Sequence, residues 1–567
     1  MSDPGNANPI FDSHLAEVKA PSDQGQQNLG SMIEVSRHGL RLFRWGWIVF
    51  MVLATSLPYL WNAALTPHGY RYDWILPPYP QDSFGYMAWS QQAARGALLF
   101  KIKYTALPQS AFLFQPFFLI CGWASRVLGC DIGVIGLVLK EVGVVLFFLV
   151  FYRYVDYLGM SSFQSVVASI LLGVSSGFGG AMRFFGWSQY PRIFSADELM
   201  PDVSTYWSLL WNPLFPYSLV LMLLTIYYLD CGTREKRKAD LWLAGLVSGL
   251  LALIHPYSQP LLFAFAVILI AVRTGTEWME YLARYLAILI PCGVYLALLS
   301  ALQPLVAQHS SRGAMPNFPF VSYLLGFGLL LLIWIAGFAV GEGRWMKQYW
   351  QIGVWFLLSL ALAYLPVWFQ RKLIFGAHVP LCIMAAVSFD KLLGRVSNLR
   401  TAKWVLAAAA IVLIPILMTT PIYLLIMQNR EVRSNRTGPY YISNDMDNAL
   451  KYLKQYGKPD QVVFARFDTS GFIPAFTGNT VVWGHWAMSV DLDARRRWFD
   501  DLQERQKWGD TDRARRFWDS GIEYIFADGD LETEITKTPR KWSDILQDAD
   551  EVFRNDTVVI YKHRAHS

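Results

Sequence analysis

Residues Tyr79–Gly96 read YPQDSFGYMAWSQQAARG and follow the first long apolar segment of the chain, residues 42–65. An acid, Asp82, lies near the start of this stretch, and an aromatic residue, Tyr86, follows it at position i+4. Residues four apart share one face of a helix, so the pattern predicts a short amphipathic helix next to a membrane-spanning one. Asp82 also suits a helix N-cap, which is the structural alternative to a functional role.

The composition is that of a membrane protein. Of 567 residues, 54% are hydrophobic and 16% are charged, whereas soluble domains carry about 25% charged residues. Aromatic residues make up 15% of the chain, as expected where rings lie at the lipid headgroups. The five cysteines form no C-x-x-C pair, which argues against a disulfide framework or a zinc site. We therefore expect an α-helical polytopic membrane protein that binds no nucleic acid.

Apolar segments of about 20 residues can span a bilayer. The basic residues Arg37, Arg41 and Arg44 precede the first segment and favour the cytoplasmic side, so the loop 66–107 is predicted to lie outside. A second basic cluster, Arg234, Lys236, Arg237 and Lys238, follows the 214–230 segment and places that end inside, so the loop 181–212 is also predicted to lie outside. An even number of crossings must join these two loops, so one of the three segments between them fails to span, which leaves about eleven spans of that length. The predicted segments are 44–64, 108–128, 131–152, 160–178, 214–230, 239–256, 259–273, 283–303, 320–340, 350–369, 373–390 and 404–427.

Three domains are predicted. Residues 1–43 are polar and should form a disordered cytoplasmic tail, residues 44–427 form the transmembrane domain, and residues 428–567 form a charged extracytoplasmic domain. In this last part, strands alternate with helices, which indicates a small α/β fold. The predicted strands are QVVFARF (461–467), YIFA (524–527) and TVVIYKH (557–563), and the predicted helices are NDMDNALKYLKQYG (444–457) and DARRRWFDDLQERQ (493–506).

Ionisable residues gather at the predicted outer ends of the spans. A charge at membrane depth is costly unless it is paired or hydrated, so such residues are functional candidates. The candidates are Asp82 in the first outer loop, Asp197 and Glu198 in the second, His255 after the 239–256 segment, and Arg371 and Lys372 after the 350–369 segment. Each has a structural alternative. The acids suit the first turn of a surface helix, the basic pair suits a snorkelling anchor, and His255 precedes a helix-breaking proline.

Acids and cations at one outer membrane face suit the transfer of a sugar from a polyprenyl phosphate. A carboxylate can take the proton of an acceptor hydroxyl, and we predict Asp82 in this role. Cations stabilise the departing phosphate oxygens, which suits Arg371 and Lys372. Tyr86, on the face of Asp82, is predicted to bind substrate.

The remaining candidates have divided roles. Asp197 and Glu198 are hard oxygen ligands that suit a divalent metal, Mg²⁺ or Mn²⁺, although they could instead bind the acceptor or the sugar directly. No other cofactor is expected. Trp486, in the sequence Gly484-His485-Trp486, is predicted to stack on a sugar ring, and a packed tryptophan in a tight turn is the alternative.

The whole chain resembles the GT-C class of membrane glycosyltransferases, which includes oligosaccharyltransferase catalytic subunits and protein mannosyltransferases. Asp82 matches the catalytic acid of the first outer loop of that class, and Asp197 and Glu198 stand in the second outer loop. Locally the chain is similar to a bacterial group of unassigned acceptor. Four phrases carry this similarity: LLWNPLFPYSLVL (209–221), LWLAGLVSGLLALIHPY (241–257), YLPVWFQRKLIFGAHVPLCIMAA (364–386) and IPAFTGNTVVWGHWAMS (473–489).

The resemblance implies an inverting glycosyltransferase in a bacterial inner membrane. Its donor would be a sugar on a polyprenyl phosphate or diphosphate, and its acceptor a glycan, lipid or protein. Arg371, then Lys372, would contact the lipid phosphate, and His255 would lie near the donor. The chain departs from the class in two ways: its first loop has a lone acid instead of the pair in protein mannosyltransferases, and its tail lacks the acceptor-peptide motif of oligosaccharyltransferases.

Two other functions remain open at this point. A transporter or flippase of lipid-linked glycans would carry charges at mid-bilayer depth, and Lys140 and Glu141 are the only such pair inside a predicted segment. A membrane scaffold could instead bind glycan through its outer domain without catalysis.

Overall fold

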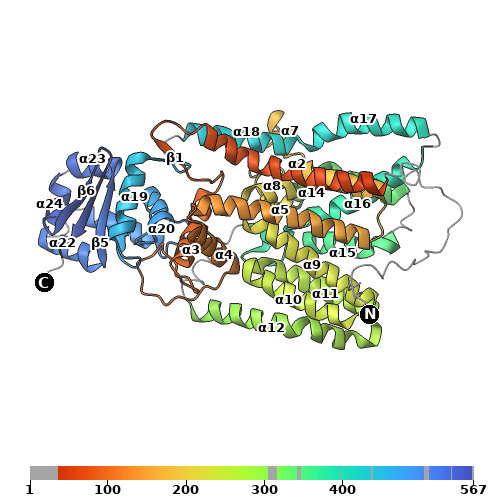
Figure 1. Cartoon of the computed structure of the whole chain (residues 1–567), viewed down its shortest axis with the longest axis horizontal. Coiled ribbons are helices and arrows are strands. Elements are labelled where there is room, and N and C mark those ends of the chain that lie inside the picture. The colour runs from red at the N-terminus through yellow and green to blue at the C-terminus, as the bar shows by residue number, and fades with distance from the viewer. Residues whose placement is uncertain are drawn as a thin grey trace, which may run out of the picture.

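A long bundle of helices carries a smaller α/β region at one end, where the C-terminus lies (Figure 1). This computed structural model describes residues 36–303, 316–340, 346–396, 399–435, 438–503, 510–537 and 539–564. The first described helix, α2, begins at Arg37, so residues 37–43 belong to a helix and not to the predicted tail. Residues 1–35 of that tail lie outside the described part of the chain.

The helices of the bundle follow the predicted apolar segments. Within the described ranges, seven helical stretches are long and apolar enough to cross a membrane, two of which, 256–302 and 403–434, each contain two helices. The predicted number of about eleven spans is therefore not confirmed. The bundle helices are α2 Arg37–Ala64, α5 Ile132–Tyr157, α9 Leu214–Arg234, α10 Lys238–Ile254, α11 Gln259–Thr274, α12 Trp278–Leu302, α14 Phe320–Val340, α15 Met346–Leu362, α16 His378–Leu393, α17 Leu399–Leu417 and α18 Thr419–Ser434.

Ion pairs show which segment between the two outer loops does not run the length of the bundle. Arg44, near the start of α2, pairs with Asp156, near the end of α5, at 2.5 Å. Arg71, after the end of α2, lies 3.9 Å from Asp131, which caps the start of α5. Helices α2 and α5 are therefore antiparallel, and α4 (Pro116–Leu128) starts and finishes at the end of the bundle that carries the α/β region.

The positions of the helix ends agree with that path, although α4 and α6 both have 13 residues and are each about 20 Å long, against about 30 Å for a bilayer core. Helix α6 (Ser162–Val174) starts at the opposite end, where Ser165 accepts a hydrogen bond from Arg44 at 3.1 Å, and leads back toward the second outer loop. The predicted segment 108–128 is thus the one that does not run through the bundle.

The C-terminal region contains a five-stranded mixed sheet in the order β4–β3–β5–β7–β6, in which β3 pairs in parallel with β4 and β5. The predicted strands correspond to β3, β5 and β7, whereas β4 and β6 were not predicted. The predicted helices correspond to α19 and α21. The elements are β3 Val462–Phe464, β4 Thr480–Val481, β5 Ile522–Asp528, β6 Ala549–Arg554, β7 Val558–His563, α19 Asn444–Tyr456, α20 Phe467–Thr477, α21 Leu492–Gln503, α22 Asp510–Asp519, α23 Gly529–Lys537 and α24 Pro539–Gln547.

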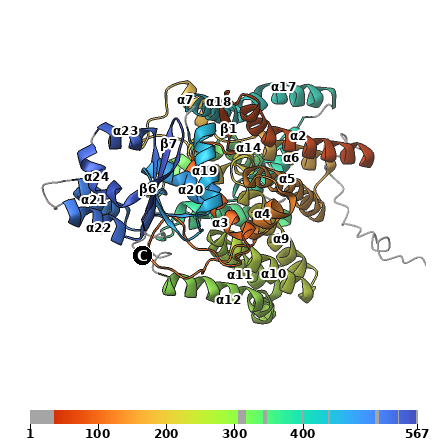
Figure 2. The ribbon, with the colours of Figure 1, turned by 60° about the vertical axis from the view of Figure 1, so that its left-hand side comes forward.

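The first outer loop and the C-terminal region share one hydrophobic core. Strand β1 (Tyr70–Tyr72) of the loop pairs with β2 (Tyr441–Ser443) of the C-terminal region. Helix α3 (Pro80–Ala94) packs on α20 through Phe84 and Phe472, whose ring centroids are 5.0 Å apart. Figures 1 and 2 both place α3 between α20 and the bundle. The first outer loop therefore packs with the C-terminal region, and α18 continues past residue 428 to Ser434.

Candidate active site

Helix α3 presents Asp82 beside the bundle. The helix begins at Pro80, whose fixed φ suits the first helical position. Asp82 lies in the first turn, where the helix dipole favours a negative charge. The N-cap residue is Tyr79, without a side-chain cap, so Asp82 does not serve as the N-cap. Its side chain remains 25% exposed, which keeps the carboxylate accessible to a substrate.

The C-terminal region covers Asp82 from the outer side. Trp486 donates its indole Nε1–H to Asp82 Oδ1 at 3.0 Å, and its backbone N–H bonds to Gln81 Oε1 at 3.1 Å. His485 Nε2 lies 3.6 Å from the same Oδ1. Burial raises the pKa of Asp82, while the Trp486 hydrogen bond and the charge of Lys372 lower it. The structure thus joins Trp486 to Asp82, a contact that the sequence analysis did not predict.

Two cations lie on the bundle side of this site. They occupy a 3₁₀ turn, η5 (Gln370–Ile374), after α15. The Arg371 guanidinium lies 4.6 Å from the centroid of the Phe318 ring, and the Lys372 ammonium lies 4.2 Å from that of the Tyr257 ring. Cation–π contacts of this length hold a cation without neutralising it. The charge of Lys372 lowers the pKa of Asp82, so these two predicted site residues are coupled electrostatically.

Asp202 is an acid that the sequence analysis did not select. It is buried in the 3₁₀ turn η2 (Pro201–Val203) of the second outer loop. Burial raises its pKa to about 6, and the charges of Lys372 and Arg371 act in the opposite direction. A buried carboxyl with a raised pKa beside cations is a candidate functional group. The available signal was its place in the same loop as Asp197, four residues after Glu198.

Tyr79 and Tyr86 connect the acids on the two loops. Burial raises the pKa of Tyr79, Arg371 lowers it, and both Asp82 and Asp202 raise it further. Tyr86 accepts a hydrogen bond from Asn212 Nδ2 at 3.3 Å, and the same two acids act on its pKa. Groups from α3, η2 and η5 therefore share one electrostatic environment, although these segments are far apart in the sequence.

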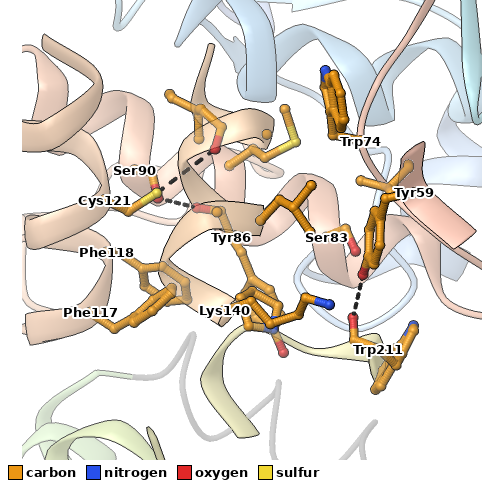
Figure 3. A pocket seen from close by; sticks show the side chains of 17 residues that line it. Tyr59, Trp74, Ser83, Tyr86, Ser90, Phe117, Phe118, Cys121, Lys140 and Trp211 are labelled. Atoms are coloured by element: carbon orange, nitrogen blue, oxygen red, sulfur yellow. Dashed lines mark hydrogen bonds between the residues drawn. The ribbon is translucent and has the colours of Figure 1, made fainter. Parts of the chain in front are cut away.

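A small cavity lies on the bundle side of Tyr86. Its volume is about 50 Å³, and aromatic side chains dominate its lining, among them Phe117, Phe118 and Trp211 (Figure 3). Ser83, the neighbour of Asp82, also lines it. The volume is enough for a few water molecules, since one needs about 10–15 Å³. The cavity can therefore hold solvent close to the acid but not a sugar.

Asp197 and Glu198 lie close to this site, but protein groups bond to all four of their carboxylate oxygens. Ser195 and Ser176 donate to Asp197, the latter at 2.8 Å. Glu198 accepts from Arg183 at 2.5 Å and from Ser188 at 2.6 Å. Within the described ranges, no group of three His, Cys, Asp or Glu residues could hold a metal ion. This arrangement does not fit a metal site, and the metal role of the pair stays an untested prediction.

His255 is buried after the end of α10. Its Nδ1 bonds to Ser258 Oγ at 2.8 Å, and its ring packs 4.7 Å from Phe375 and 5.4 Å from Tyr257. Tyr257 in turn contacts Lys372. His255 thus supports the surface on which Lys372 rests, and direct contact with substrate stays a prediction.

Comparison with known proteins identifies the fold. No protein-family model matches the sequence, and no curated protein is similar to it. The mycobacterial arabinofuranosyltransferase AftD matches with a TM-score of 0.53 and 14% identity over 94% of this chain. This chain spans only 40% of AftD.

Two further solved structures are more distantly similar. ArnT from Cupriavidus metallidurans, bound to undecaprenyl phosphate, has a TM-score of 0.47 and 12% identity over 92% of this chain and 98% of its own. AglB from Archaeoglobus fulgidus, bound to an inhibitory peptide and dolichol-phosphate, has a TM-score of 0.47 and 13% identity over 88% and 70%. These structural neighbours are GT-C glycosyltransferases. The fold of this chain is that of the GT-C class, as the resemblance in sequence predicted.

Proposed function

We propose that the protein is an inverting glycosyltransferase that moves a sugar from a polyprenyl phosphate, or diphosphate, to an acceptor hydroxyl. It acts at the extracytoplasmic face of a bacterial inner membrane, with the N-terminus in the cytoplasm and the C-terminal region outside. The observation that carries this proposal is that Asp82, in the first turn of α3, lies within the electrostatic reach of Lys372, the neighbour of Arg371. A base and two cations from separate loops are what this transfer requires.

The reaction needs one base and one stabilised leaving group. Asp82 takes the proton from the acceptor hydroxyl as its oxygen attacks the anomeric carbon. The bond between that carbon and the phosphate oxygen breaks, and the phosphate leaves with the electron pair. Lys372 and Arg371 offset the negative charge that develops on it. A single displacement inverts the anomeric centre, and no step is assigned to a metal.

The Lys140–Glu141 pair supports the transferase over a transporter. Lys140 Nζ lies 2.8 Å from Glu141 and donates to the backbone oxygens of Thr55 at 2.9 Å and Leu210 at 3.3 Å. Thr55 donates its hydroxyl to Glu141 at 2.7 Å. Both charges are thus bonded to α2, which suits a role in holding α2 and α5 together better than a role in lining a transport path.

The test is Asp82→Asn in the purified full-length protein. The donors are undecaprenyl-phosphate-linked glucose, mannose, galactose and arabinofuranose with a tritium label, and the acceptors are panels of oligosaccharides, lipids and peptides. We expect the wild-type protein to transfer the labelled sugar of one of these donors to an acceptor. Asp82→Asn should lower the rate of that transfer at least about 100-fold, as for removal of a general base. The control Asp530→Asn changes an acid that is 85% exposed and should keep the wild-type rate. Transfer by Asp82→Asn at the wild-type rate would reject Asp82 as the base, whereas no transfer by the wild-type protein to any acceptor would favour the scaffold.

A further inference from the structure

His485 lies in a tight turn of the C-terminal region, directly against α3. Its ring is buried, and its Nδ1 faces the backbone N–H groups of Ala487 and Met488, each at 3.1 Å. A ring nitrogen that accepts hydrogen bonds carries no proton, so the neutral imidazole must carry its proton on Nε2. The fold of the turn therefore sets the tautomer of this histidine.

The protonated nitrogen points at Asp82. Nε2 lies 3.6 Å from Asp82 Oδ1, slightly longer than a hydrogen bond, and contacts of this kind often shorten when substrate binds. Helix α3 leaves room for this approach at Gly85, where an added Cβ would lie 3.5 Å from Nε2 and 2.8 Å from the Met488 methyl group. On the other side the His485 ring packs 5.3 Å from the Tyr104 ring, which fixes its direction.

We propose that His485 is a positioning residue for Asp82, and that the C-terminal region thereby completes the active site of the membrane domain. This inference rests on the proposed glycosyltransferase function. Trp486 Nε1–H donates a hydrogen bond to Oδ1, and His485 Nε2–H points at the same oxygen. The other oxygen, Oδ2, therefore remains to take the proton from the acceptor hydroxyl. A donor to the ionised carboxylate stabilises that form, so His485 keeps Asp82 ready as a base although burial opposes its charge.

The other charged and titratable groups around Asp82 come from three elements. Lys372 faces it from η5, and Tyr79 and Tyr86 flank it along α3. Asp202, from η2, acts on the same two tyrosines. A substitution at residue 485 leaves all of these side chains in the protein. The effect of His485 on the pKa of Asp82 can therefore be separated from their effects.

Two amides separate the positioning role from a structural one. In His485→Gln, the amide nitrogen occupies the place of ring Nε2 and can still donate to Asp82, but the acceptor for the turn is lost. In His485→Asn, the amide oxygen occupies the place of ring Nδ1 and can still accept from Ala487 and Met488, but the donor to Asp82 is lost. A residue that only shapes the turn should tolerate Asn better than Gln, and a positioning residue should show the reverse.

The direct measurement is an infrared titration of the full-length protein in nanodiscs. The C=O stretch of protonated Asp82 is the band absent from Asp82→Asn. We expect its midpoint to move to higher pH in His485→Asn and to stay near wild type in His485→Gln. In the tritium transfer assay, the acid limb should move in the same direction, and the rate of His485→Asn below its midpoint should fall about tenfold, as for loss of a hydrogen bond to a charged group.

The outcomes distinguish this inference from the proposed function. An unchanged midpoint in His485→Asn, or a shifted midpoint in His485→Gln, would overturn the positioning role even if Asp82→Asn is inactive. If His485→Asn fails to fold, the His485→Gln titration still decides, because a positioning role requires it to match wild type. Absence of transfer by the wild-type protein would reject the proposed function without reference to His485, and wild-type transfer by Asp82→Asn would reject Asp82 as the base.

Discussion

Lys103 offers a sharp test of whether the C-terminal region is locked onto the first outer loop. Its side chain is 3% exposed, and Nζ bonds to Asp460 at 2.9 Å and to the carbonyl of Pro459 at 2.8 Å. Lys101 also reaches Asp460, but at 3.4 Å and from a side chain that is 33% exposed. The two lysines thus bind one acid from a buried and from an exposed position, which makes Lys101→Met the matched control for Lys103→Met.

The magnitude follows from these contacts. Hydrogen bonds that involve a charged group contribute about 1.5–3 kcal/mol each, and desolvation, which lowers the pKa of Lys103, offsets part of the two. We expect Lys103→Met to destabilise the docked state by about 2 kcal/mol. Lys101→Met should cost at most about 0.5 kcal/mol, as is typical of exposed pairs.

Hydrogen exchange measures this difference at the interface itself. The amide of Val481, on β4, donates to the backbone oxygen of Lys103 at 2.9 Å, so it exchanges only when the contact opens. A loss of 2 kcal/mol corresponds to about 30-fold faster exchange in Lys103→Met, with little change in Lys101→Met. Equal rates in the two variants would refute the claim that the contacts of the buried Lys103 side chain hold the regions together.

Three further substitutions test the site. Trp486→Phe removes the indole donor that lowers the pKa of Asp82, so the acid limb of the pH–rate profile should move to higher pH without a change in donor KM. Lys372→Gln should move the limb in the same direction, because its charge also lowers that pKa, and should raise donor KM by about tenfold through loss of a phosphate contact; an unchanged KM would place the phosphate elsewhere. Arg183→Met leaves Glu198, whose side chain is 1% exposed, without its cation and should destabilise the protein by about 2 kcal/mol. The loss should be visible as a lower Tm in detergent, and an unaltered Tm would exclude a structural role for the Arg183–Glu198 ion pair.

The order of the bundle could be predicted because each apolar segment must satisfy its own backbone inside a bilayer. The segment 320–340 coincides with α14. Length alone did not reveal that 108–128 stays at one end of the bundle, since that depends on the partners of Arg71 and Arg44. The predicted count of about eleven spans is not confirmed, because α11 and α12 lie in one apolar stretch and helices such as α10 and α15 have only 17 residues each.

The candidate site could be predicted only for ionisable residues that lie in loops at the predicted ends of the spans. Asp82, Arg371 and Lys372 were selected because charge at a membrane surface is costly. Trp486 was selected for stacking on sugar, yet its indole N–H bonds to Asp82, a contact across more than 400 residues that no local pattern encodes. Asp202 was passed over because its burial, and hence its raised pKa, depends on how the second loop folds against η5.

We predict that a lipid phosphate binds at Lys372 and Arg371, and the charge of Lys372 already acts on Asp82. A cryo-electron microscopy structure of the full-length protein in nanodiscs with undecaprenyl phosphate tests it most directly. We predict that the phosphate lies within hydrogen-bond distance of Lys372 or Arg371, on the side of η5 that faces α3, with its polyprenyl chain along the bundle. A phosphate bound away from both cations, with Asp82 separated from it by ordered protein, would contradict the account.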